Sequence, residues 1–119
     1  MRVLLVDDEE ELVSALAERL SFRGMEAAWA TSGQKALELA SRTCFDLAVL
    51  DVKMPGMGGI ELKGRLAQAC PGLKVLFLTG HGSEDDFRRG SAESGKDFYL
   101  VKPVDIETLI KKMHEAARR

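Results

Sequence analysis

The sequence has little of several features that mark specialised classes of protein. No apolar stretch approaches the roughly 20 residues that span a bilayer. The apolar run after Arg2 is interrupted at Asp7, so we expect neither a membrane segment nor a secretory signal peptide. The formal net charge is only -2, which gives no electrostatic footprint for DNA or RNA. We therefore expect a cytoplasmic domain that binds neither nucleic acid nor a membrane directly.

Cysteine is also scarce. Cys44 and Cys70 are the only two in the chain, and two thiols with no close spacing make neither a disulfide framework nor a zinc site. We expect two partly buried thiols in a reducing cytoplasm. The glycines at 56, 58 and 59 do not match the spacing of a phosphate-binding P-loop, and no Gly-Lys-Ser/Thr follows them, so they indicate a flexible loop.

What the chain does have is the composition of one globular domain, spanning residues 1–119. Of its 119 residues, 45% are hydrophobic and 30% are charged, which suits a folded protein with a sizeable core. Short apolar runs rich in Val, Leu and Phe recur five times, and such runs are typical of strands buried on both faces of a parallel sheet. They cover residues 3–6, 27–30, 47–50, 75–78 and 98–101.

Segments of helix length separate these runs. Four of them carry apolar residues at a spacing near 3.6, which is typical of amphipathic helices. Their apolar positions are 12, 13, 16 and 20; 36, 37 and 40; 62, 66 and 69; and 106, 109, 110, 113 and 117. Residues 83–94 are predicted as a further helix, the fourth along the chain, although they are polar and contain Gly90. The alternation predicts a doubly wound α/β fold with a five-stranded parallel sheet and five helices.

Polar groups follow four of the five predicted strands. Ligands bind beyond the carboxyl ends of the strands in open parallel sheets, and those ends carry Asp7-Asp8, Asp51, Thr79 and Lys102. Each of these residues taken alone has an ordinary explanation as a helix cap, a turn residue or a solvated side chain. Independent caps and turns need not fall on one rim of one sheet, so the whole set indicates a site.

Three carboxylates near that rim repel one another. At about 5 Å and an effective dielectric near 20, each pair costs roughly 3 kcal/mol. Lys102 or a hard divalent cation would offset this cost. Mg²⁺ binds through one or two carboxylates and bridges to phosphate oxygens, and an Asp beside it can act as a nucleophile toward phosphorus. The residues therefore predict a Mg²⁺ cofactor and phosphoryl transfer.

Four segments together resemble the receiver domain of response regulators in two-component signalling systems. They are residues 3–9, 51–59, 78–82 and 99–103, and the resemblance covers essentially the whole chain. It implies a flavodoxin-like sheet of strand order 2-1-3-4-5. It also implies phosphorelay signal transduction, in which a phosphohistidine on a sensor histidine kinase or a phosphotransfer protein supplies the phosphoryl group.

The resemblance assigns a role to each member of the acidic cluster. Asp51 would be the phosphoacceptor. Asp8 and Asp51 would ligate Mg²⁺ together with the backbone carbonyl of Lys53, and Asp7 would act through a metal-bound water. The chain would then be a switch that assists its own phosphorylation and dephosphorylation, and not an enzyme.

The resemblance also assigns the groups that bind the phosphoryl oxygens and respond to the new charge. Thr79 and Lys102 would each bind a phosphoryl oxygen, and Tyr99 would turn inward when Thr79 moves. Pro103 would hold the peptide geometry after Lys102, where the family often has a cis bond. The switched surface would lie around the fourth helix, fifth strand and fifth helix, where an output domain, an effector protein or a phosphorylation-linked second copy docks. The polarity of residues 83–94 departs from that pattern.

Three residues are expected at the mouth of the site. Lys53 and His81 lie two residues after Asp51 and Thr79, at positions that tune acyl-phosphate hydrolysis in the family. Two solvated side chains are an equally good interpretation. Gly80 stands where Ala is more usual, and its small size would leave the site open.

Two other functions remain as alternatives. A phosphatase that forms an aspartyl phosphate would typically have a second Asp two residues after the nucleophile, where this chain has Lys53. A receiver-like binding module that is never phosphorylated would usually lack part of the acidic cluster or the lysine, and this chain has both. The sequence does not name the cognate kinase or the output.

Overall fold

The computed structural model describes residues 1–80 and 98–118. Its five strands form one sheet in the order β2-β1-β3-β4-β5, and every neighbouring pair is parallel. The strands are β1 (Arg2–Val6), β2 (Glu26–Ala30), β3 (Leu47–Asp51), β4 (Lys74–Thr79) and β5 (Phe98–Val101). The predicted strand order is confirmed, and each predicted run matches a strand to within one residue at either end.

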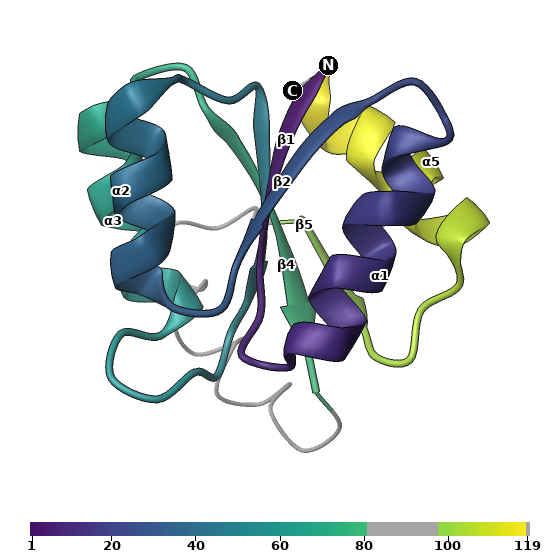
Figure 1. Ribbon diagram of the computed structural model, residues 1–119, viewed down its shortest axis with the longest axis horizontal. Helices are drawn as coiled ribbons and strands as arrows, with labels where there is room; N and C mark the ends of the chain where they lie inside the picture. Colours follow the sequence, from purple (N-terminus) through teal and green to yellow (C-terminus); the bar gives the residue numbers. More distant parts are fainter. Residues whose placement is uncertain (81–97, 119) are drawn as a thin grey trace.

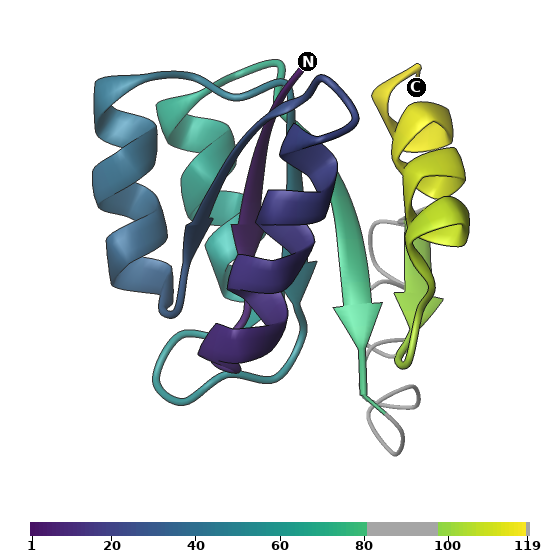
Figure 2. The same cartoon turned by 45° about the vertical axis from the view of Figure 1, so that its right-hand side comes forward.

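Helices cover both faces of this sheet (Figure 1). They are α1 (Glu10–Ser21), α2 (Gly33–Arg42), α3 (Gly59–Ala69) and α5 (Ile106–Ala117). Figures 1 and 2 show α2 and α3 on one face, with α1 and α5 on the other. These four confirm their predictions, and the helix predicted over residues 83–94 lies outside the described residues. No helix in the described ranges has the length and apolar content needed to cross a membrane.

The core has two halves because successive strand residues point to opposite faces of the sheet. On β1, Leu4 and Val6 pack toward α2 and α3, and Val3 and Leu5 pack toward α1 and α5. All five residues of the central strand β3 are buried, including Asp51. The two faces are closed by helices, so polar groups can gather only at the rims of the sheet.

Local signals place the helix ends. The Ser32 side chain accepts a hydrogen bond from the backbone N–H of Lys35 at 3.2 Å and so caps the N-terminus of α2. Asp105 caps α5 in the same way through Thr108, at 2.7 Å. Gly24, in the turn that follows α1, has a φ of 84°, a conformation that favours glycine.

The expectation of two separate thiols is wrong. Cys44 and Cys70 form a disulfide, with their Cα atoms 5.6 Å apart across a sequence separation of 26. Cys44 follows the C-terminal end of α2, and Cys70 caps the C-terminal end of α3. The two helices lie side by side on one face (Figure 1), so their ends meet. Spacing along the chain carries no signal of that contact.

Candidate phosphorylation site

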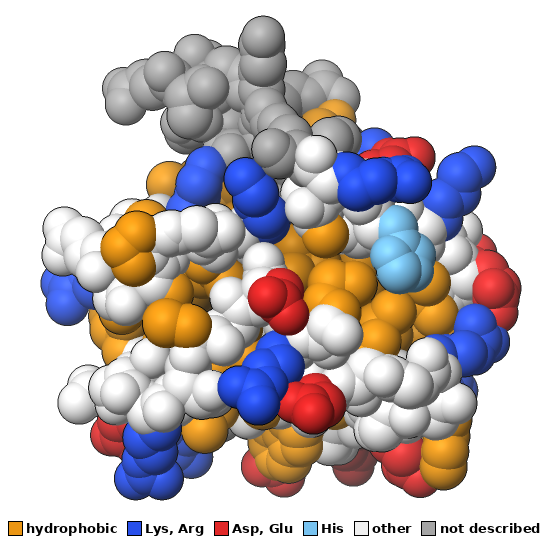
Figure 3. Space-filling view, turned by 90° about the horizontal axis from the view of Figure 1, so that it is seen from above, with side chains coloured by type: hydrophobic (Ala, Val, Ile, Leu, Met, Phe, Trp, Pro, Cys, Tyr) orange, Lys and Arg blue, Asp and Glu red, His pale blue; other side chains and the backbone are white. Residues whose placement is uncertain are grey.

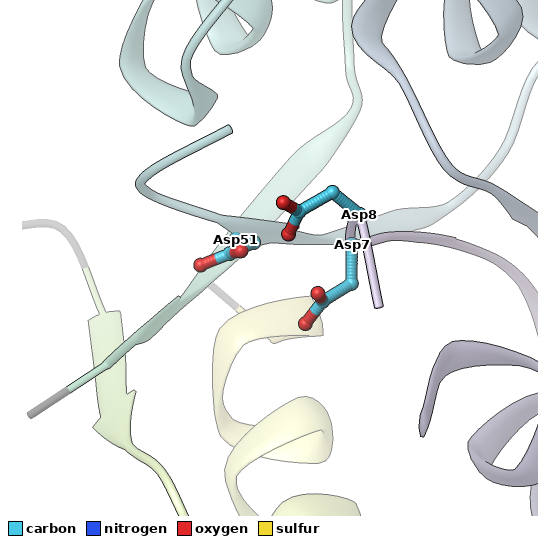
Figure 4. A group of neighbouring side chains, drawn as sticks. All are labelled: Asp7, Asp8 and Asp51. Atoms are coloured by element: carbon cyan, nitrogen blue, oxygen red, sulfur yellow. The ribbon is translucent and has the colours of Figure 1, made fainter. Parts of the chain in front are cut away.

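Three carboxylates from two neighbouring strands converge at the carboxyl rim of the sheet (Figure 4). Asp7 and Asp8 follow β1, and Asp51 is the last residue of β3, which pairs with β1. One oxygen of each carboxylate lies within 4.8 Å of an oxygen of the others. Asp7 and Asp51 are only 2% and 5% exposed, and Asp8 is open to solvent. The predicted convergence of the acidic groups is therefore present.

Lys102 reaches this cluster from the end of β5. Its Nζ lies 2.7 Å from Oδ2 of Asp7 and 3.6 Å from Oδ2 of Asp51. The Lys102 side chain is only 17% exposed. Its backbone N–H donates to the carbonyl of Thr79 at 2.8 Å, which ties the end of β5 to the end of β4. The ammonium is thus placed between two buried carboxylates.

The surroundings shift the pKa values of both partners. Burial, helped by the negative charges of Asp7 and Asp8, raises the pKa of Asp51 to about 6, against the opposing charge of Lys102. Burial works to lower the pKa of Lys102, but its close pairing with Asp7 and the charge of Asp51 outweigh this, so the net shift is upward. Near neutral pH the site therefore holds an ammonium and a largely ionised Asp51.

The donor set suits a hard divalent cation. Three carboxylates face one close ammonium, which leaves excess negative charge at the rim. Asp7 Oδ1 accepts a hydrogen bond from the backbone N–H of Glu9 at 3.0 Å. Its buried Oδ2 accepts no well-directed hydrogen bond within the described part of the chain, although it touches the Lys102 ammonium. Carboxylate oxygens with unused acceptor capacity are the ligands that Mg²⁺ prefers, so these residues fit the ion.

Thr79 is the last residue of β4, and Tyr99 lies on the neighbouring strand β5, opposite Phe77. Thr79 is fully buried, and its hydroxyl donates to the carbonyl of Leu100 at 3.4 Å. Tyr99 is half-buried and packs against the half of the core that α2 and α3 cover. The Thr79 hydroxyl is thus held by the residue directly after Tyr99.

The remaining predicted positions are distributed around the cluster. Lys53 is exposed, and its backbone N–H donates to the Asp51 carboxylate. Gly80 and Pro103 line a recess of about 450 Å³ that also contains Lys102. The Lys102–Pro103 peptide bond is cis, as the family resemblance implied. His81 lies outside the described residues.

Sequence reasoning missed two residues of this site. Glu9 Oε1 lies 3.5 Å from Lys102 Nζ; the run of five acidic residues at 7–11 was the available signal, but Glu9 was given no role at the site. Gly59 packs so closely that a Cβ there would lie 2.3 Å from the carbonyl oxygen of Asp51. The backbone N–H of Gly59 also donates to the carbonyl of Val52 at 2.9 Å. Gly59 is therefore a point of close packing and not part of a loose loop.

Comparison with known proteins agrees with this geometry. The family model described as the response regulator receiver domain matches residues 3–114, and the chain belongs to this family. Receiver domains are phosphoacceptor switches of two-component signalling and not classical enzymes, and response regulators work with histidine kinases and output domains.

Individual relatives are similar over the full length of this chain. Response regulator MprA of Mycobacterium leprae is 36% identical over 119 residues, which is 100% of this chain and 52% of the relative. The chain thus spans about half the length of the curated relatives that it matches. The crystal structure of a CheY-like receiver domain protein from Methanospirillum hungatei has a TM-score of 0.86 and 32% identity, covering 98% of this chain and 93% of that one.

Another similar solved structure contains a phosphorylated aspartic acid and a divalent cation. It is a response regulator protein from Burkholderia pseudomallei with a phosphorylated aspartic acid, a calcium ion and citrate. It has a TM-score of 0.81 and 26% identity, with 98% of this chain and 68% of that chain covered.

Proposed function

We propose that this chain accepts a phosphoryl group on Asp51 from a phosphohistidine of a sensor histidine kinase or a phosphotransfer protein. The observation that carries the proposal is the buried Asp51 carboxylate, 3.6 Å from the Lys102 ammonium and grouped with two further carboxylates. The similar Burkholderia protein, described with a phosphorylated aspartic acid and a divalent cation, supports the same class of chemistry here.

The transfer forms one bond and breaks one. A carboxylate oxygen of Asp51 attacks phosphorus as the P–N bond of the phosphohistidine breaks, and the departing imidazole nitrogen keeps the electron pair. Asp51 must be ionised to attack, and a pKa of about 6 leaves it largely ionised at pH 7. Lys102 neutralises charge on the phosphoryl oxygens, since it already lies beside the nucleophile.

Asp8 and Asp51, with the backbone carbonyl of Lys53, would hold Mg²⁺, and Asp7 would act through a metal-bound water. When bound, the ion would neutralise negative charge on the phosphoryl oxygens. The buried Asp7 keeps the Lys102 ammonium at the site in the meantime. The same groups would let the domain assist its own phosphorylation and dephosphorylation.

Phosphorylation would then switch the surface of the domain. A phosphoryl group brings roughly -1.5 to -2 charges on a hydroxyl side chain, and a comparable charge is expected on Asp51. The Thr79 hydroxyl would leave the Leu100 carbonyl, which it now bonds at 3.4 Å, for a phosphoryl oxygen. Tyr99 would turn inward as Thr79 moves, which would change the surface of β5 and α5. An output domain, an effector protein or a second copy of the chain would bind the changed surface with a different affinity.

The assignment of Asp51 as phosphoacceptor rests on the three carboxylates and Lys102. A receiver-like module that is never phosphorylated would not need this complete set. The aspartyl-phosphate phosphatase alternative would place an Asp where Lys53 stands. Lys53, Gly80 and His81 remain predicted modulators of hydrolysis at the site mouth, and residues 1–119 remain our proposal for the receiver domain.

Labelling with acetyl phosphate and Mg²⁺ tests the proposal. We expect intact-mass spectrometry to show one added phosphoryl group on the unaltered chain and none on Asp51→Asn. Asp46→Asn, which alters an exposed carboxylate at the opposite end of β3, should label normally. Chelation of Mg²⁺ should stop the reaction. Equal labelling of Asp51→Asn would refute the assignment, and sustained turnover of a small phosphoester would favour the phosphatase.

A further inference from the structure

The Cys44–Cys70 disulfide lies in a hollow at the end of the sheet opposite the acidic cluster. Both cysteines line this hollow, which has a volume of about 430 Å³. That volume is within the range of small-molecule sites, roughly 300 to 1,000 Å³. Figure 3 looks onto this end of the molecule and shows apolar side chains gathered between charged ones. A small molecule in the hollow would lie directly against the disulfide.

The two cysteine residues differ in exposure. Cys44 is exposed, whereas Cys70 is only 4% exposed. Thiol–disulfide exchange requires a thiolate to reach one sulfur while the other departs, and access decides which sulfur is attacked. An incoming thiolate would therefore bond to Sγ of Cys44, and Cys70 would be the leaving thiolate.

The reduced form of the pair is accommodated as well. Sγ of Cys44 lies 3.9 Å from the carbonyl oxygen of Ala69, and Sγ of Cys70 lies 3.9 Å from that of Ala40. Each free thiol would thus find a carbonyl acceptor at the end of the neighbouring helix. No large rearrangement is needed to satisfy the two thiols, and this favours a pair that changes oxidation state reversibly.

The charges around the hollow indicate what kind of thiol fits. Asp46 and Lys74 both line it, and the backbone N–H of Lys74 donates to the Asp46 carbonyl at 3.1 Å, which holds the two residues together. The Asp46 carboxylate also accepts a hydrogen bond from the backbone N–H of Arg2 at 2.8 Å, so the hollow is bordered by one partly engaged carboxylate and by the ammonium of Lys74. A small thiol that carries an ammonium and a carboxylate of its own matches this arrangement better than a neutral thiol does.

We propose that the Cys44–Cys70 pair is a thiol–disulfide exchange site for a low-molecular-weight zwitterionic thiol bound in this hollow. In the first step the ligand thiolate bonds to Cys44, and the Cys70 thiolate is released and takes up a proton. A second ligand thiolate then attacks the ligand sulfur of the mixed disulfide and releases Cys44. Two ligand thiols are oxidised to one ligand disulfide, and the protein disulfide is reduced to two thiols. In the reverse direction the Cys70 thiolate attacks Sγ of Cys44 in the mixed disulfide, and the ligand thiolate is released. Cys70 is therefore the resolving thiol.

Glutathione serves as the probe for the first test. The oxidised full chain would be treated briefly with reduced glutathione, quenched with an alkylating agent and mapped by peptide mass spectrometry. We expect glutathione on Cys44 and the alkylating group on Cys70. Glutathione mainly on Cys70, or no mixed disulfide at all while a strong reductant opens the pair, would overturn the proposal.

A second test uses single variants and oxidised glutathione. Cys70→Ala should form a mixed disulfide at Cys44 at least about tenfold faster than Cys44→Ala forms one at Cys70, because access controls the rate. Circular dichroism would check that both variants are folded. If either variant is unfolded, the peptide mapping of the unaltered chain still tests the proposal. Similar rates in the two folded variants would contradict the assignment.

The charge match can be tested separately. Lys74→Ala should slow reduction of the disulfide by glutathione several-fold relative to reduction by neutral 2-mercaptoethanol, since an ammonium near the site attracts the ligand carboxylate. Lys35→Ala, which alters an exposed lysine in the first turn of α2, should leave the ratio of the two rates unchanged. An unchanged ratio in Lys74→Ala would remove the case for a zwitterionic ligand.

Discussion

The ammonium of Lys102 lies 2.7 Å from Oδ2 of Asp7, and both side chains are shielded from solvent. This pairing holds the ammonium at the rim of the sheet before any phosphoryl group arrives. Because Lys102 is also 3.6 Å from Asp51, a small movement would bring it onto a phosphoryl oxygen. The same ammonium therefore offsets carboxylate repulsion at rest and neutralises new charge after transfer.

Removal of that ammonium should impair phosphorylation more than it impairs folding. We expect Lys102→Ala to lower the rate of labelling by acetyl phosphate by about 10²- to 10³-fold, the usual cost of losing a charge-stabilising group. Lys102→Arg should recover only part of the rate, because a guanidinium fork does not replace a compact ammonium. Lys35→Ala is the control for loss of one positive charge. A Lys102→Ala rate equal to that of the unaltered chain would contradict this role.

Asp51 should destabilise the folded protein at neutral pH. Its pKa is raised from 3.8 to about 6 on folding, so the folded state binds this proton more tightly than the unfolded state does. The stabilising effect of protonation is complete below about pH 3.8 and is lost as the pH rises through about 6. Above that range the ionised carboxylate costs about 2 to 3 kcal/mol.

We therefore expect Asp51→Asn to be more stable than the unaltered chain at pH 8 in the absence of Mg²⁺. The gap of about 2 to 3 kcal/mol should close as the pH approaches 4. Urea unfolding at both pH values would measure it. A gap of equal size at pH 4 and pH 8 would show that packing, and not ionisation, separates the two proteins.

Gly59 should tolerate no side chain. A Cβ there would lie 2.3 Å from the backbone oxygen of Asp51, so the loop beside the phosphoacceptor would have to shift. We expect Gly59→Ala to destabilise the fold by about 1 to 3 kcal/mol. A Cβ added at Gly64, in the same helix, would have nothing within 4 Å of it, and Gly64→Ala should stabilise the fold by roughly 0.5 to 1 kcal/mol. Equal effects in the two variants would mean that the close contact is not present.

The disulfide should contribute to stability whatever its reactivity. It closes a loop across a sequence separation of 26, for which chain entropy gives a stabilisation of about 3 to 4 kcal/mol. We expect a reductant to lower the midpoint of thermal unfolding of the unaltered chain. The double variant Cys44→Ala/Cys70→Ala should show no response to reductant. If the reductant frees both thiols and the midpoint of thermal unfolding does not change, the predicted stabilisation by the disulfide is contradicted.

Much of this architecture could be predicted from the sequence because it depends on local pattern. Apolar runs indicated all five strands, and the spacing of apolar residues indicated α1, α2, α3 and α5. The convergence of Asp7, Asp51 and Lys102 followed from one rule, that parallel strands end on a common rim. The four segments that resemble the receiver family were not needed for that step, although they supplied the strand order.

What could not be predicted depends on contacts between distant segments. The meeting of Cys44 with Cys70 requires the packing of α2 against α3, which no local pattern encodes. The packing of Gly59 against the Asp51 backbone is set by how the loop after β3 enters α3. Glu9 faces Lys102 only because α1 begins where it does. The aromatic role of Tyr99 and the site-mouth roles of Lys53 and Gly80 remain predictions.

Chemical mapping of the phosphorylated residue tests the central claim most directly. The chain would be phosphorylated with acetyl phosphate and Mg²⁺ and then reduced with borohydride, which converts an aspartyl phosphate to homoserine. Peptide sequencing by mass spectrometry would locate the converted residue. We expect homoserine at position 51 and at no other aspartate. Conversion at Asp7 or Asp8, or a phosphoryl group retained on a hydroxyl or imidazole side chain, would contradict the assignment of Asp51 as the phosphoacceptor.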